Sequence, residues 1–343
     1  METKLNYKRT FLIGLAFLSI CSFWQMYDNI IPLILQNTYH LGETMTGAVM
    51  ALDNVLAIFL LPVCGMLSDK VHTKLGRRMP FIVVGTILAV IFMMMLPMID
   101  NAEKARWATG GSFSNQVFFL GVLFLTLVSM GLYRSPAVAL MPDVTPNHLR
   151  SRANAVINLM GAVGGVYALI MIKVLVGKGE TPDYLPLFSS IAAVMAIAVG
   201  ILVITIRENK LREEVEKAEA ANADTIEEKA MAEGVEAAGE IEAVGDTGEA
   251  KAFEEKQQTA KTESAKDMPK DVKRSMYFML ASIFLWFTAY NAVTTAFSRY
   301  TKVVWKMEGG SFANCLMVAT VAAIFSYIPI GSISAKIGRK RTI

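Results

Sequence analysis

The sequence has few of the residues on which most enzymes rely for their chemistry. Among 343 residues there are only three histidines and three cysteines, and they are spread along the chain rather than grouped. We find no glycine-rich nucleotide-binding loop, no spacing typical of metal ligands and no pairing of a nucleophile with a base. These absences argue against an enzyme, and we expect no cofactor, no metal and no nucleic-acid partner.

Charge is also scarce along most of the chain, and long apolar runs take its place. Hydrophobic residues make up 54% of the sequence and the mean hydropathy is +0.43, which is too apolar for a soluble domain. Apolar runs of roughly 20 residues can cross a bilayer as helices. The sequence therefore predicts an all-α, polytopic membrane protein. We predict eight spans, at about 11–36, 45–67, 79–98, 115–141, 153–176, 185–206, 275–298 and 311–335.

The segment 207–274 interrupts this pattern. It holds 12 of the 33 basic residues and 19 of the 30 acidic residues, and Phe253 is its one aromatic residue. Low hydrophobicity and high charge keep such a segment from forming a packed core, although parts of it could form a transient solvated helix. We predict a six-helix bundle over 1–206, a charged and largely disordered cytoplasmic linker over 207–274, and the start of a second bundle over 275–343.

Lysine and arginine are concentrated on one side of the predicted spans. With the N-terminus inside, the cytoplasmic ends carry most of the basic residues, which is the usual bias. The last outer connection weakens the bias, because it also carries Arg299, Lys302 and Lys306. We predict a multi-pass protein of the cytoplasmic (plasma) membrane with its N-terminus in the cytoplasm.

The connection between the second and third spans has an unusual order of residues. It reads GMLSDKVHTKLGRRMPF, residues 65–81. Positive charge alone could hold this hairpin on the cytoplasmic side. Glycine also permits close helix approach, and an acid at the end of one helix can meet the positive N-terminus of another. We therefore predict a conformational latch, made of Gly65, Asp69, Gly76, Arg77 and Arg78.

The latch stretch resembles the signature loop of the major facilitator superfamily, and RRMPFI resembles its sugar-transporting branches. A second stretch, YRSPAVALMPDVTPNHLRSRANAVINLMG at residues 133–161, is similar to the fourth-to-fifth helix connection of the same branches. These are the glycoside–pentoside–hexuronide:cation symporters and the sucrose:proton symporters. The resemblance covers nearly the whole chain outside 207–274, and it implies a secondary transporter built of two six-helix bundles.

An internal repeat agrees with two homologous halves. GSISAKIGRKR at residues 331–341 echoes the latch stretch, and SIFLWFTAYN at 282–291 echoes SICSFWQMYDN at 19–29. The second copy of the latch has Ala335 in place of Asp69. We expect that the sequence covers the first eight of twelve helices; the alternative is a true eight-span protein with one unpaired half-bundle.

Polar residues inside the spans are the candidate substrate and proton site, because they are costly to bury in a membrane. Asp28 lies deep in the first span, where Trp24 shares its helix face and Asn29 flanks it. Asp53 and Asn54 lie in the second span. Either acid could carry a proton beside a sugar-stacking tryptophan, or could instead make a structural hydrogen bond between helices.

Resemblance to the melibiose-type members bears on the coupling ion. Those members bind sodium with two acids on the second helix, near a proline. Aligned on Pro62, the two positions are Ala57 and Leu61 here, so both acids are absent. We therefore favour a proton, carried by Asp53 or Asp28, as the coupling cation.

Further candidates lie on the fourth and seventh spans. Sucrose-type relatives carry an arginine and an acid on the fourth helix, and Arg134 with Asp143 looks similar at a wider spacing. The alternative is an ion pair that only stabilises the bundle. Tyr290 and Asn291 hold the place in the seventh span that corresponds to the first-span site.

The sequence as a whole predicts a monomeric transporter in the lipid bilayer that moves a sugar or glycoside by proton-coupled symport. Two alternatives remain open: an exporter of drugs or metabolites on the same scaffold, and a membrane sensor that transports nothing. The acids and the arginine within the spans favour transport, since a sensor need not carry protons.

Overall fold

The computed structural model describes residues 6–71, 73–110, 115–146, 149–179, 181–217 and 270–337, and these are almost entirely helical. The chain divides into two units, residues 1–216 with 294–343 and residues 217–293. We describe each unit by itself. The helices are α1 (Tyr7–Asn37), α2 (Glu43–Lys70), α3 (Met79–Ala108), α4 (Gln116–Asp143), α5 (Arg150–Leu175), α6 (Leu185–Thr205), α9 (Lys270–Val303) and α10 (Ala313–Ile337). The all-α prediction is confirmed.

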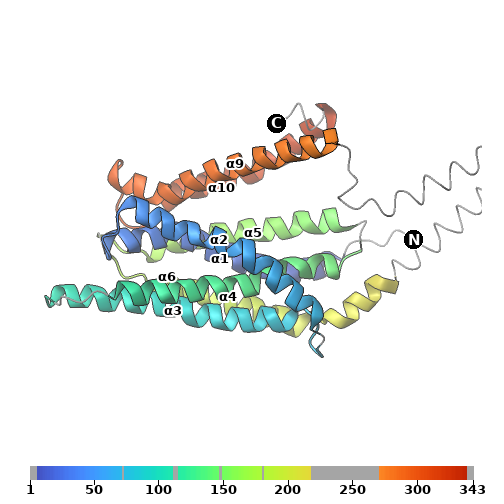
Figure 1. Ribbon diagram of the computed structural model, residues 1–343, viewed down its shortest axis with the longest axis horizontal. Helices are drawn as coiled ribbons and strands as arrows, with labels where there is room; N and C mark the ends of the chain where they lie inside the picture. The colour runs from blue at the N-terminus through green and yellow to red at the C-terminus, as the bar shows by residue number, and fades with distance from the viewer. Residues whose placement is uncertain are drawn as a thin grey trace, which may run out of the picture. The chain divides into compact units, whose positions relative to one another are not determined.

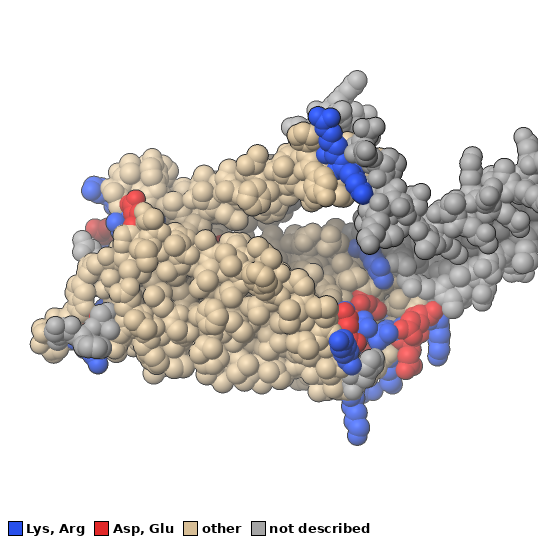
Figure 2. Space-filling view, in the orientation of Figure 1, with Lys and Arg blue, Asp and Glu red and all other residues tan. Residues whose placement is uncertain are grey.

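Seven helices of the described part are long and apolar enough to cross a membrane, namely α1 to α6 and α9. A shorter apolar stretch, Ala313–Ser326, lies in α10. Charged side chains gather at the ends of the first-unit helices, and their flanks are almost free of charge on the visible face (Figure 2). This distribution is what a bilayer selects, because the hydrocarbon core admits apolar side chains and the interfaces admit charge.

The six helices α1 to α6 lie side by side within the first unit (Figure 1). The main packing partners of α1 are α5 and α6, while α3 packs against α4 and α6, and α2 against α4. Small residues allow the closest approaches. A Cβ on Gly164 of α5 would lie 2.1 Å from the carbonyl oxygen of Leu18, and one on Gly85 of α3 would lie 2.7 Å from the amide nitrogen of Tyr133. Larger side chains at these two positions would force the helices apart.

Hydrogen bonds within the core reinforce this packing. The hydroxyls of Tyr133 and Ser19 lie 2.5 Å apart, and the tyrosine hydroxyl also donates to the carbonyl oxygen of Ala16 at 3.0 Å. Ser22 donates to the carbonyl oxygen of Gly164 at 2.9 Å. These three buried hydroxyls find partners inside the bundle, as an apolar surrounding favours, and they fix α1 against α4 and α5.

The start of α10 and the end of α9 pack against the other helices of the first unit. A Cβ on Gly310 would lie 2.1 Å from the carbonyl oxygen of Ile172 in α5, and Phe312 beside it is fully buried. The guanidinium of Arg299 donates to the Oδ1 atom of Asn37 at 3.3 Å. These contacts join helices from both expected halves at one end of the first unit.

The beginning of the predicted linker differs from the expectation of a largely disordered segment. Residues 208–217 are helical, and the side chains of Leu211 and Val215 are buried. The apolar spacing of these two residues gives the short helix a face that packs on the bundle. Residues 218–269, the rest of the predicted linker apart from its end, lie outside the described residues.

Candidate functional site

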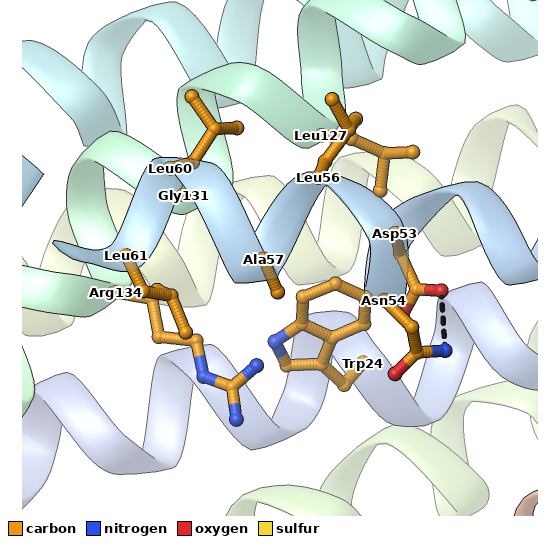
Figure 3. Close-up of a pocket in the computed structure, with 10 residues that line it drawn as sticks. All are labelled: Trp24, Asp53, Asn54, Leu56, Ala57, Leu60, Leu61, Leu127, Gly131 and Arg134. Atoms are coloured by element: carbon orange, nitrogen blue, oxygen red, sulfur yellow. Dashed lines mark hydrogen bonds between the residues drawn. The ribbon is translucent and has the colours of Figure 1, made fainter. Parts of the chain in front are cut away.

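A small pocket of about 40 Å³ opens between α1, α2 and α4 (Figure 3). Its wall is mostly leucine, interrupted by one indole, one carboxylate, one amide and one guanidinium. The wall contains Trp24 from α1, Asp53, Asn54, Leu56, Ala57, Leu60 and Leu61 from α2, and Leu127, Gly131 and Arg134 from α4. An apolar pocket with a few convergent polar groups is the usual form of a small-molecule site. Four of the predicted site residues therefore lie together: Trp24, Asp53, Asn54 and Arg134.

Trp24 occupies the middle of the pocket, and its indole ring lies between Arg134 and the Asp53–Asn54 pair in Figure 3. The guanidinium carbon of Arg134 is 5.6 Å from the ring centroid, within cation–π range. The indole nitrogen of Trp24 is buried, and no described residue accepts a hydrogen bond from it. A ligand oxygen in the pocket could therefore accept that bond while an apolar face of the ligand packs on the ring.

Two carboxylates lie close to one another at this pocket. The Nδ2 atom of Asn54 donates to Asp53 at 2.8 Å, and this bond is drawn in Figure 3. Asp28 of α1 does not line the pocket, but its carboxylate is near enough to Asp53 for the two charges to interact. Because both lie within predicted membrane spans, simultaneous ionisation of the two carboxylates is disfavoured.

The two positions that the resemblance to melibiose-type members predicted to lack sodium-binding acids also line this pocket. Ala57 and Leu61 both line it, and neither offers an oxygen ligand from its side chain. Throughout the described ranges, no three side chains of His, Cys, Asp or Glu come together as metal ligands would. The carboxylate that remains in the pocket is Asp53, one turn before Ala57.

Three other predicted site residues do not line this pocket. Asn29 is buried against its own helix, where its Nδ2 atom donates to the carbonyl oxygen of Gln25 at 2.8 Å. Tyr290 and Asn291 lie in the part of α9 that belongs to the second unit. There the ring of Tyr290 stacks on Trp286 with centroids 6.0 Å apart.

The predicted latch residues form an ion cluster at one end of α2, α3 and α4. Asp143 at the end of α4 accepts hydrogen bonds from Arg77 and from the Nε atom of Arg78, each at 2.9 Å. Asp69 lies 2.5 Å from Arg78 and 3.8 Å from Arg77. Burial lowers the pKa of Arg77, but the hydrogen bond and charge of Asp143, together with the charges of Asp69 and Glu208, raise it more, so the net shift is upward. Arg77 therefore stays charged.

The two glycines of the latch differ in their surroundings. The carbonyl oxygen of Gly65 accepts hydrogen bonds from Ser68 at 2.9 Å and from Arg78 at 3.3 Å. Gly76 has a φ of +127°, a conformation that side-chain-bearing residues rarely adopt. The structure thus brings all five predicted latch residues into one short loop and its neighbouring helix ends.

The sequence analysis compared Arg134 and Asp143 with the arginine and the acid on the fourth helix of sucrose-type members. In the structure these two side chains do not pair with each other. Asp143 is occupied by Arg77 and Arg78, and Arg134 lies in the pocket with Trp24. The two side chains are nine positions apart along α4, which places one in the pocket and the other at the helix end. Arg134 is therefore free of an ion pair within 4 Å among the described residues.

Sequence reasoning missed Glu208, which lies just after the C-terminal end of α6 and contacts the latch loop. It accepts hydrogen bonds from three consecutive backbone amides at the start of α3. The available signal was indirect. Pro80 marks the first turn of a helix. The N-cap residue of that helix makes no side-chain cap bond, so the first amides of the helix are open to an acceptor from elsewhere in the chain.

Comparison with known proteins gives one family and a set of similar plant proteins. The family model described as "Major Facilitator Superfamily" matches residues 7–343. The chain is similar to "Sucrose transport protein SUT3" of Oryza sativa subsp. japonica, at 26% identity over 137 residues, which is 38% of this chain and 27% of that protein. It is also similar to "Sucrose transport protein SUC4" of Arabidopsis thaliana, at 36% identity over 117 residues, or 32% and 22% of the two chains. The matched part thus spans about a quarter of each relative's length.

Proposed function

The chain belongs to the major facilitator superfamily, and from this premise we propose that it is a secondary active transporter that moves a sugar or glycoside together with a proton. The observation that carries the proposal is the pocket between α1, α2 and α4. It combines Trp24, which has an indole donor without a described partner, with a carboxylate and a guanidinium inside the membrane-spanning region. The similar plant proteins are named as sucrose transport proteins, which supports a sugar as the substrate class.

In the proposed mechanism, the substrate packs an apolar face on Trp24 and its hydroxyls meet the polar groups on either side of the ring. The proton is held by Asp53 or shared with Asp28, which keeps one of two neighbouring acids neutral. Arg134 is near enough to Asp53 to respond to its charge. Binding of both ligands then favours rocking of the two bundles around the site, which exposes it to the other side.

The test is uptake of a labelled sugar panel into vesicles that contain the purified protein. With an inward proton gradient, at least one sugar or glycoside should accumulate about tenfold or more above empty vesicles, because one pH unit supplies 1.36 kcal/mol per proton. A sodium gradient at fixed pH should produce no accumulation. Trp24→Leu should lose the uptake, whereas Val117→Ala on the exposed surface of α4 should keep it. Transport of none of the sugars, or efflux of apolar drugs instead, would contradict the proposal.

We also propose that the N-terminus and the latch face the cytoplasm. The test uses single cysteines in a variant in which Cys21, Cys64 and Cys315 are replaced. An impermeant thiol reagent applied to intact cells should leave a cysteine at Glu213 unlabelled and should label one at Lys178, since these exposed residues lie at opposite ends of α6. The reverse pattern would invert the orientation.

A further inference from the structure

The start of α3 needs a hydrogen-bond acceptor that its own loop does not supply. The first amides of a helix have no partner within the helix. Arg78 occupies the N-cap position of α3 and its side chain makes no cap bond. Its guanidinium is engaged instead with Asp143, Asp69 and Ser68.

Glu208, just beyond α6, supplies the missing acceptor. Its Oε1 atom accepts from the amides of Arg77 and Arg78, both at 2.9 Å, and its Oε2 atom accepts from Arg78 and Met79, both at 3.0 Å. Only 1% of Glu208 is exposed. One buried carboxylate thus satisfies three consecutive amides and meets the positive end of the helix dipole.

The loop is shaped to admit this carboxylate. A Cβ on Gly76 would lie 2.2 Å from the Oε2 atom of Glu208, so a side chain there would displace the acid. Beside it, Asn209 donates to the carbonyl oxygen of Thr73 at 3.1 Å. The buried side chains of Leu211 and Val215 hold the helical residues 208–217 on the bundle, so the position of Glu208 is set by packing and not only by its own bonds.

The same stretch of backbone carries the two arginines of the latch. Arg77 and Arg78 donate their amides to Glu208 on one side and extend their guanidinium groups to Asp143 on the other. We propose that Glu208 is a positioning residue for transport. By fixing the backbone of residues 76–79 it aims both arginines, so that the latch closes the cytoplasmic end of the pocket. This inference rests on the proposed function.

The decisive variant is Glu208→Gln, with Glu214→Gln as its matched control. The amide has almost the shape of the carboxylate, but one oxygen becomes an NH₂ group that faces backbone donors and cannot accept from them. Glu214 lies two turns further along the same helical segment, where its exposed side chain pairs with Arg9 at 2.7 Å. The control therefore makes the same chemical change on a surface where ion pairs contribute little.

The first measurement is hydrogen exchange of the full chain in lipid nanodiscs, read by mass spectrometry on peptides that cover residues 74–82. The loss of charge-assisted bonds should speed exchange of these amides roughly ten- to a hundredfold in Glu208→Gln. Glu214→Gln should exchange like the unmodified protein. Unchanged exchange in Glu208→Gln would overturn the inference.

The second measurement separates a positioning role from a merely structural cap. A single cysteine at Leu61 in the pocket wall reports opening through its labelling from the cytoplasmic side of inside-out vesicles. Glu208→Gln should increase the labelling rate about threefold or more, which corresponds to a shift of the resting population. Its transport turnover should fall about tenfold while KM stays nearly constant, because substrate contacts are intact.

Faster exchange with unchanged labelling and turnover would show that Glu208 only caps α3, and would overturn the inference. Equal effects in Glu214→Gln would do the same. If Glu208→Gln does not fold, Glu208→Asp keeps the charge with a shorter reach and should give intermediate exchange and labelling; values like those of the unmodified protein would contradict the role. Hydrogen exchange and cysteine labelling need no substrate, so both can succeed even if no sugar is transported and the proposed function fails.

Discussion

Replacement of Asp53 by asparagine should abolish accumulation of substrate against its gradient and leave downhill exchange within about threefold of the original rate. Asparagine keeps the size and hydrogen-bonding capacity of the side chain but cannot release a proton. Asp53 is the one carboxylate of the pocket wall, and it lies on the far side of Trp24 from Arg134 in the close-up (Figure 3). Loss of the titrating group should therefore uncouple substrate movement from the proton.

Counterflow and gradient-driven uptake, measured on the same vesicles, distinguish coupling from folding. Val117→Ala is the control, since this exposed residue of α4 does not line the pocket; accumulation should survive in this variant. If Asp53 serves only as a structural contact between helices, both activities and the expression level should decrease together. Accumulation that persists in the Asp28→Asn, Asp53→Asn double variant, or that needs sodium at fixed pH, would rule out the coupling proposal.

The second large effect is expected at Asp143, which should matter more for stability than Asp69. Asp143→Asn leaves two arginines with reduced compensation at a site where 19% of the Asp143 side chain and 7% of the Arg78 side chain are exposed. Removal of one partner from such a partly buried, hydrogen-bonded pair costs about 1–3 kcal/mol. Asp69 is 50% exposed, and an exposed partner contributes about 0–1 kcal/mol. Thermal unfolding in detergent should therefore show a larger decrease for Asp143→Asn.

A ligand-binding assay tests the role of Asp69 separately from its effect on stability. Asp69→Asn should keep substrate binding and alter only the resting distribution of conformations, because Asp69 lies in the ion cluster and not in the pocket wall. Equal losses of stability in Asp143→Asn and Asp69→Asn would contradict the argument from burial. Complete loss of binding in Asp69→Asn at unchanged expression would place this acid in the site instead.

The helices could be predicted from the sequence because long apolar runs leave the chain little choice in a membrane. The latch could also be predicted, since its residues are contiguous and their order carries the signal. Contacts between distant segments could not be predicted in the same way. The partner of Asp143 depends on which side chains a helix end meets, and Arg77 reaches it across 66 positions of sequence.

The candidate site was predictable in part for the same reason. Helical spacing predicts which residues share a face of α1 with Trp24. It does not show whether that face packs against α2 or against another helix. Asp53 and Asn54 line the pocket, whereas Asn29 turns to its own helix. Glu208 was hidden by its surroundings in sequence, because a single buried acid is inconspicuous at the edge of a segment that is acidic throughout.

The bond between Glu208 and the loop before α3 also sets an order of events during biosynthesis. The amide of Arg77 and its acceptor are 131 residues apart. At a synthesis rate of about 5–20 residues per second, roughly 7 to 26 s pass between their emergence from the ribosome. During that interval the first turn of α3 lacks its acceptor, so the loop between α2 and α3 is not yet fixed while α4, α5 and α6 are synthesised. The loop that joins α2 and α3 therefore reaches its final arrangement only after α6 is complete.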